Sequence, residues 1–255
     1  VRRALLHARE HAFDRRKRAM QFDGQNVLVV GGSSGIGEAA ARAFAAGGAS
    51  VTIASRDAAR LAASAARIGH GVRTGVMDTT DDTSVRAFFD SAGEFDHVVV
   101  SAAQTPTGPM RGLALADAYA AMDSKFWGAY RVARAVRIRQ GGSLTFVSGF
   151  LSVRPSKTSV LQGAINAALE SLARGLALEL SPVRVNTVSP GLIATPLWSK
   201  LDAQARDRMY EGAAARLPAG RVGQPEDVAN AVLYLASTPY ATGSTVLVDG
   251  GGAIA

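Results

Sequence analysis

Short apolar runs alternate with helix-forming segments along almost the whole chain, and this alternation restricts the fold more than any other feature. The runs are four to six residues long and mostly rich in valine, isoleucine and leucine, as is typical of parallel strands buried on both faces. Helices between such strands form right-handed crossovers that cover both faces of the sheet. We therefore predict one α/β domain, a doubly wound parallel sheet of about seven strands. The expected strands are residues 26–30, 50–54, 72–77, 96–100, 142–147, 183–188 and 245–248, and the expected helices run from 37 to about 46 and over 57–68, 81–92, 114–137, 160–180 and 225–236.

The composition is compatible with one such domain. The chain has 255 residues, of which 47% are apolar, and this is enough for a single large core. It contains no cysteine and no apolar run of membrane-spanning length, so we expect a cytoplasmic protein without disulfides or thiol chemistry. Of the four histidines, His7 and His11 lie in the first twenty residues, and His70 and His97 are far from them and from each other, so no metal site is expected.

Most of the net charge of +7 lies near the start of the chain. Residues 1–20 contain seven arginine and lysine residues against two acidic residues, whereas the remainder is nearly balanced. A basic tail can contact nucleic acid, but charge confined to one end argues against a basic binding face. We therefore treat residues 1–19 as a basic extension of a domain over 20–255, and expect neither a nucleic-acid nor a membrane partner.

A glycine-rich segment follows the first expected strand and opens the first expected helix. Glycines there allow the backbone to approach a pyrophosphate, and the free N–H groups of the helix N-terminus favour an anion. A structural tight turn would look similar, but the position between strand and helix favours nucleotide binding. The expected contacts to the nucleotide are Gly31, Ser33, Ser34, Gly35, Ile36 and Gly37.

The second strand ends in Ser55 and Arg56, where an acidic residue would bind the ribose hydroxyls of NAD. A hydroxyl and a guanidinium group instead suit a 2′-phosphate, so we expect NADP(H) to be preferred over NAD(H). An alternative is that Arg56 only covers the sheet edge. Asp78, after the third strand, is expected to accept from the adenine amine or to cap the next helix.

Several segments together resemble the short-chain dehydrogenase/reductase family over residues 22–252. They are Gly31 to Gly37, Ala167-Ala-Leu-Glu-Ser-Leu172, Arg184-Val-Asn186, Ser189 to Pro196, Thr242-Gly, and Val248-Asp-Gly-Gly251, and they occur in the order found in the family.

The resemblance implies a single Rossmann-like domain that binds NAD(P) and forms a homodimer or homotetramer through the helices at 114–137 and 160–180. It also implies that residues 192–216 form a lid over a small-molecule substrate, with apolar side chains that suit a partly apolar ligand. Further cofactor contacts implied by the family are Ser101, Ala102 and Ala103 beside the adenine, Pro190 and Gly191 near the nicotinamide, the backbone of Ile193 at the carboxamide, and Thr195 at a phosphate.

The reaction centre departs from the family pattern. The segment that begins at Ala167 directly follows the catalytic lysine in relatives, so Asn166 occupies the lysine position and Gln162 the tyrosine position. By the same register Gly149 occupies the serine position, with Ser148 beside it. Lys125 stands where relatives carry an asparagine, so lysine and asparagine have exchanged places.

Glutamine cannot release a proton at accessible pH, and this argues strongly against the usual route through a tyrosine. If the two helices pack as in relatives, Lys125 lies in the pocket and supplies charge or the proton, because burial lowers the pKa of a lysine. Asn166 and Gln162 would bind the ribose and the substrate, and Ser148 or Lys157 would be a further donor.

The predicted function is transfer of hydride between NADP(H) and a small carbonyl, alcohol or activated double bond. The alternative is a catalytically impaired nucleotide-binding protein that senses cofactor or stabilises a partner, in which Lys125 only reaches towards solvent.

Overall fold

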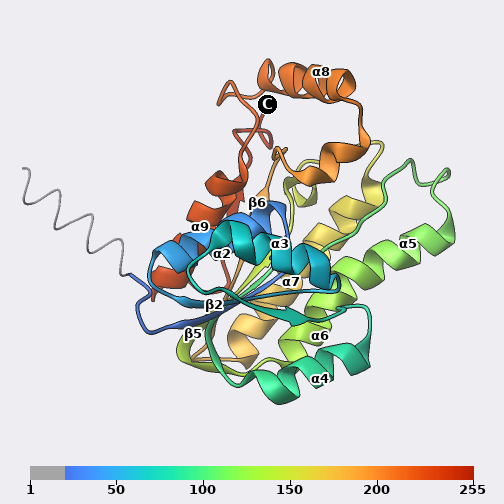
Figure 1. The fold of residues 1–255 in the computed structure, drawn as a ribbon. Helices are drawn as coiled ribbons and strands as arrows, with labels where there is room; N and C mark the ends of the chain where they lie inside the picture. The colour runs from blue at the N-terminus through green and yellow to red at the C-terminus, as the bar shows by residue number, and fades with distance from the viewer. Residues whose placement is uncertain (1–20) are drawn as a thin grey trace, which may run out of the picture.

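The computed structural model describes residues 21–255, and it is built on one sheet of seven parallel strands in the order β3-β2-β1-β4-β5-β6-β7 (Figure 1). The chain adds β2 and β3 on one side of β1 and then returns to add β4 to β7 on the other side. This arrangement confirms the predicted doubly wound, Rossmann-like fold. The strands are β1 (Asn26–Val30), β2 (Ser50–Ser55), β3 (Arg73–Val76), β4 (Phe95–Val100), β5 (Ile138–Val147), β6 (Arg184–Pro190) and β7 (Thr245–Val248).

Helices cover both faces of the sheet (Figure 1). On one face, α2, α3 and α9 pack on alternate residues of the central strands, with Phe44, Leu61 and Val232 buried. On the other face, α4, α6 and α7 bury Phe89, Val132 and Leu169. The helices are α2 (Gly35–Ala46), α3 (Ala58–Ile68), α4 (Asp82–Ala92), α5 (Leu115–Met122), α6 (Gly128–Ala135), α7 (Val160–Glu179), α8 (Ala203–Ala214) and α9 (Pro225–Ser237).

Polar side chains mark the starts of several helices. The carboxylates of Asp57, Asp81 and Asp202 accept from backbone N–H groups in the first turns of α3, α4 and α8. These groups have no partner within the helix, so a capping carboxylate stabilises the helix by about 1 kcal/mol. The predicted start of α3 near residue 57 follows from this cap.

The stretch predicted as one helix over 114–137 is divided into three parts. A π-helical turn, η1 (Asp123–Trp127), joins α5 to α6, and α6 ends at Ala135. Strand β5 then starts at residue 138, whereas the sequence predicted residue 142. A π turn inserts an extra residue per turn and redirects the side chains that follow, and hydrophobic periodicity does not reveal it. Such turns occur often at functional sites, and this one contains Lys125.

The predicted extension, residues 1–19, lies outside the described residues. Within residues 21–255, no helix combines the length and the apolar character that crossing a membrane requires.

The imidazole of His97 is buried near the amino end of the sheet. Its Nε2 donates to Gln25 Oε1 over 2.9 Å, so its Nδ1 accepts from the Ser143 hydroxyl over 2.8 Å. The ring also packs against Phe22 and Phe44. Burial, with a smaller effect of Arg184, lowers the pKa of His97 from 6.5 to about 4. The folded protein therefore holds this ring neutral.

We predict that His97 makes the protein less stable in acid. The unfolded chain binds a proton below pH 6.5 and the folded chain only near pH 4, so the free energy of unfolding should fall by about 1.4 kcal/mol per pH unit between these values. Urea unfolding of wild type and His97→Gln over this range measures the effect. His70→Asn, at an exposed histidine, is the control and should keep the wild-type slope. An unchanged slope in His97→Gln would contradict the prediction.

Candidate active site

The strand order reverses between β1 and β4, and doubly wound sheets bind ligands outside the carboxyl ends of their strands at such a point. Gly31 follows β1, and Ser101 follows β4. The Ser101 hydroxyl donates to the carbonyl of Val30 over 3.1 Å, which ties the two strand ends together. The predicted residues Ala102 and Ala103 continue the same loop.

Gly31 and Gly37 have no room for a side chain. A Cβ on Gly31 would lie 2.6 Å from the backbone nitrogen of Ala102 and 2.8 Å from Ser101 Oγ. A Cβ on Gly37 would collide with the carbonyl of Gly31. The turn therefore presents bare backbone at the start of α2, together with Ser33, Ser34 and the other residues of the predicted loop. This geometry fits a phosphate cradle.

The end of β2 carries polar groups that suit a phosphorylated ribose. Ser55 Oγ is buried and has no hydrogen-bond partner within residues 21–255. The exposed guanidinium of Arg56 donates to Gln104 Oε1 over 2.8 Å, and Arg60 donates to Ser34 Oγ over 3.1 Å. A buried hydroxyl without a partner, next to two arginines without acidic partners in this part of the chain, leaves donors for an anionic ligand.

Asp78 lies in a turn before α4. Its Oδ1 accepts from the backbone N–H of Thr80 over 2.9 Å and from the Thr80 hydroxyl over 2.8 Å. The first of these bonds holds the pKa of Asp78 below its ordinary value. The cap of α4 is Asp81, so Asp78 shapes the preceding turn, and its role towards adenine stays a prediction.

The segment after β6 is held against the glycine-rich loop. The backbone of Gly191 packs on Asp249, where a Cβ would approach within 2.7 Å. Ile193 is buried and pairs with Gly223, and the methyl group of Thr195 faces Gly35, 3.4 Å from a Cβ placed there. Thr195 therefore adjoins the glycine-rich loop, and Pro190, the last residue of β6, pairs with Val248 of β7.

The predicted lid consists of a short 3-10 helix, η3 (Pro196–Lys200), and α8. Trp198 Nε1 donates to the carbonyl of Ile193 over 2.9 Å, which anchors the start of this segment. The side chain of Leu197 is 69% exposed. An anchored base with exposed apolar side chains is suited to close over a ligand, and the role as a lid stays a prediction.

Lys125 and Asn166 meet in space. Nζ of Lys125, in η1, donates to Asn166 Oδ1 over 2.6 Å and to the carbonyl of Ser148 over 2.6 Å. The first bond joins η1 to α7, and the second joins η1 to the end of β5. The two exchanged residues are thus direct hydrogen-bond partners.

Burial lowers the pKa of Lys125 from 10.5 to about 8, and the negative charge of Glu170 opposes this shift. At neutral pH the ammonium group is therefore mostly charged, and it is far more acidic than an exposed lysine. A group with this pKa can supply positive charge or a proton near physiological pH.

Ser148, which the sequence predicts as a further donor, already uses its hydroxyl within the protein. Its hydroxyl donates to Glu170 Oε1 over 2.7 Å, and it is 4% exposed. Ser152 and Ser189 donate to the same oxygen over 2.7 and 3.2 Å. Three hydroxyl groups stabilise a buried carboxylate, which explains how an acid is tolerated here.

Glu170 was not singled out from the sequence. It lies one turn after Asn166 on α7, on the same helix face, and this i, i+4 spacing is the one signal that was available. Ser148 links the two charged groups, because its carbonyl accepts from Lys125 and its hydroxyl donates to Glu170.

Gln162 contacts the loop that follows β4. Its Nε2 donates to the Thr105 hydroxyl over 2.9 Å and to the Thr105 carbonyl over 3.1 Å. The amide of Gln162 therefore holds this loop, and the assignment of Gln162 to the tyrosine position stays a prediction. Lys157 is exposed on the loop before α7. The structure therefore brings Lys125, Ser148 and Asn166 into direct contact, and neither Gln162 nor Lys157 hydrogen-bonds to this group among the described residues.

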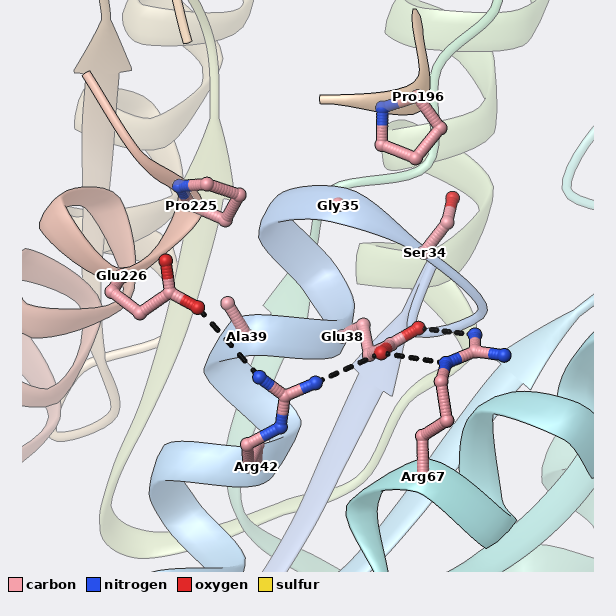
Figure 2. A pocket seen from close by; sticks show the side chains of 9 residues that line it. All are labelled: Ser34, Gly35, Glu38, Ala39, Arg42, Arg67, Pro196, Pro225 and Glu226. Atoms are coloured by element: carbon pink, nitrogen blue, oxygen red, sulfur yellow. Dashed lines mark hydrogen bonds and ion pairs between the residues drawn. The ribbon is translucent and has the colours of Figure 1, made fainter. Parts of the chain in front are cut away.

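A pocket of about 290 Å³ lies between α2, α3 and α9, and it shares Ser34 and Gly35 with the glycine-rich loop (Figure 2). Glu38 there accepts from Arg67 over 2.6 Å and from Arg42 over 3.0 Å, and Arg42 also approaches Glu226. Burial raises the pKa of Glu38, but hydrogen bonds from Arg67 and Ser64 leave it below its ordinary value. The charged groups satisfy one another, and the pocket is not lined by Lys125 or Asn166.

Comparison with known proteins identifies the family. The family described as enoyl-(acyl carrier protein) reductase matches residues 30–252. D-erythrulose reductase of Gallus gallus is 33% identical, and the match covers 91% of this chain and 97% of that protein. The chain therefore belongs to the short-chain dehydrogenase/reductase family, a family of oxidoreductases.

Solved structures show the same relationship. A small-chain dehydrogenase in complex with NADPH is 34% identical, with a TM-score of 0.79, over 91% of this chain and 100% of that one. A short-chain oxidoreductase from Pseudomonas aeruginosa PAO1, described as containing an atypical catalytic center, is 28% identical, with a TM-score of 0.82, over 90% and 97% of the two chains.

We predict that Glu170→Gln lowers the pKa of Lys125 further below about 8, because the substitution removes the negative charge that opposes the effect of burial. NMR titration of the lysine side chains measures the change directly. Glu179→Gln, at the exposed end of the same helix, is the control and should leave the titration of Lys125 unchanged. A wild-type midpoint in Glu170→Gln would show that the two groups are not coupled.

Proposed function

We propose that this protein is an NADP(H)-dependent oxidoreductase that acts on a small organic substrate through a lysine and asparagine centre in place of the usual tyrosine and lysine. The observation that carries the proposal is the contact between Lys125 Nζ and Asn166 Oδ1 at 2.6 Å. Membership of the family supports the reaction class, and the exchanged pair supports a site that retains a lysine ammonium group beside the cofactor crevice.

The residues around β2 support NADP(H) over NAD(H). The position that would hold an acidic residue carries Ser55 and Arg56, and Arg60 adds a second guanidinium group that already contacts Ser34 in the glycine-rich loop. Arginine binds phosphate through two parallel hydrogen bonds, and within residues 21–255 neither Arg56 nor Arg60 forms a salt bridge that would occupy its guanidinium group. The buried Ser55 hydroxyl, which lacks a partner in the described chain, supplies a further group for the ribose.

The proposed role of each residue follows from the charge, the proton or the hydrogen bonds that its side chain can supply. NADP(H), when bound, supplies or accepts the hydride. Lys125 places positive charge beside the substrate oxygen, and its pKa near 8 allows it to carry a proton. Asn166 and Gln162 bind and orient, since amides donate and accept hydrogen bonds without giving up protons. Candidate substrates are small carbonyl compounds, alcohols or activated double bonds.

The surface of α5 to α7 supports self-association through these helices. On α5, Leu115 and Tyr119 are each 71% exposed, and Trp127 of η1 and Tyr130 of α6 are also exposed, with their rings in contact. Exposed large apolar residues on neighbouring helical segments are typical of contacts between subunits. We propose a homodimer or homotetramer that uses this surface.

A second candidate is a nucleotide-binding protein without turnover, which senses cofactor or stabilises a partner. The observation that favours it is the bond from Gln162 to Thr105, because the tyrosine position then holds a loop and no proton donor. The two candidates differ in one measurement. Tight NADPH binding without oxidation across a broad panel of carbonyl compounds and activated alkenes favours the second.

We predict that Lys125→Met abolishes the activity of the proposed enzyme. Loss of the ammonium group removes both the charge and the proton, so kcat/KM should fall by about a hundredfold or more, while the midpoint of NADPH binding should change little. Steady-state kinetics and fluorescence titration with NADPH measure the two effects.

The matched control is Arg174→Met, which removes a positive charge from an exposed position on α7 and should leave kcat/KM unchanged. If Lys125→Met retains wild-type kcat/KM, the lysine has no part in the reaction.

We predict that Arg56→Ala weakens NADPH binding by roughly tenfold to a hundredfold, as expected for lost hydrogen bonds to a charged group, and leaves NADH binding nearly unchanged. Titration of each variant with both cofactors gives the ratio of the dissociation constants for NADPH and NADH. Arg73→Ala serves as the control, because Arg73 is also exposed but lies at the start of the neighbouring strand β3, away from the carboxyl end of β2. Equal losses for the two cofactors would remove Arg56 from the 2′-phosphate site.

A further inference from the structure

The amide of Asn166 has one end occupied and the other end open. Its Oδ1 accepts from Lys125, and because an ammonium group only donates, the opposite end of the amide must be the Nδ2 donor. Across residues 21–255, no hydrogen-bond acceptor is found for Nδ2, although the side chain is only 4% exposed. Nδ2 also does not belong to the unpaired atoms that are sealed from solvent. A donor of this kind needs an acceptor from outside the chain.

Gly149 gives Nδ2 its space. A Cβ at position 149 would lie 2.7 Å from Nδ2 and 3.3 Å from Cγ of Asn166. No side chain fits there while Asn166 keeps its position. The family resemblance places a substrate-binding serine at 149, so an amide N–H now points into the space where that side chain would begin.

The neighbouring charges decide which acceptor suits this donor. The Lys125 ammonium group bound to Oδ1 polarises the amide, and this makes Nδ2–H a stronger donor. The carboxylate of Glu170 has its Oε1 occupied by three serine hydroxyls. A polarised amide backed by a cation stabilises an acceptor that bears negative charge more than a neutral hydroxyl.

We infer that Asn166 and Lys125 form an oxyanion site in the space opened by Gly149, and that this site binds the charged oxygen of enolates and phenolates. The inference rests on the proposed function only in placing this oxygen at the reacting end of a substrate. Binding of the oxyanion itself requires no turnover. Lys125 acts partly through Asn166 in this arrangement, and Asn166 is the group that touches the ligand.

The test uses 4-nitrophenol, whose anion has its own visible absorbance. The protein, with and without saturating NADP⁺, is titrated at a pH below the probe's solution pKa. We expect wild type to bind the phenolate form and so to lower the apparent pKa of the probe. Asn166→Asp keeps an oxygen towards Lys125 but removes the N–H group, and should bind the phenolate about tenfold to a hundredfold more weakly. Gly149→Ala should show a similar loss, because its methyl group displaces the amide.

Gly175→Ala is the matched control, since an added methyl group there meets nothing within 4 Å. It should bind the phenolate as wild type does. Thermal unfolding midpoints identify a variant that fails to fold, and the two variants at different positions provide independent tests.

The site does not exist if wild type binds no probe or only the neutral phenol, or if folded Asn166→Asp binds the phenolate as tightly as wild type. Phenolate binding without any NADPH oxidation would overturn the proposed reaction and leave the oxyanion site standing. NADPH turnover without phenolate binding would support the proposed reaction and exclude the oxyanion site.

Discussion

All strands of the sheet run parallel, so their carboxyl ends meet at one edge, and every feature of the candidate site depends on this constraint. Gly31, Ser101, Ser148 and Pro190 lie at or just after the ends of four adjacent strands. Residues that are more than a hundred positions apart are thereby brought to one edge of the sheet. The helices contribute only what faces this edge, namely the start of α2, the π turn η1 and the first turns of α7.

Two opposite charges lie inside this edge, and each reduces the cost of burying the other. Lys125 has backbone and amide oxygens as acceptors, whereas Glu170 has three hydroxyl donors. Neither charge is left without hydrogen bonds, and this is the condition under which buried ions are tolerated. Ser148 contacts both groups, and the negative charge of Glu170 raises the pKa of Lys125.

The fold was predictable because buried parallel strands and capped helices have local signals. The apolar run before Gly31 and the cap at Asp57 are visible in any short window of sequence. Glu170 was not predictable, because its burial depends on Ser148, Ser152 and Ser189, which come from other elements. The π turn at Lys125 also escaped prediction, since the apolar pattern of a helix does not record an inserted residue. The alignment to the family motifs did predict that Lys125 and Asn166 lie close together, because it assumed that their two helices pack as in relatives.

The altered positions of the centre depend on one another. With Asn166 in place, a serine at 149 would collide with its amide. With Lys125 in place, a lysine at 166 would put a second ammonium group beside the first, where Oδ1 now accepts over 2.6 Å, and like charges at such a distance are unfavourable. A serine at 149 therefore requires the Asn166 amide to move, and a lysine at 166 removes the acceptor of Lys125.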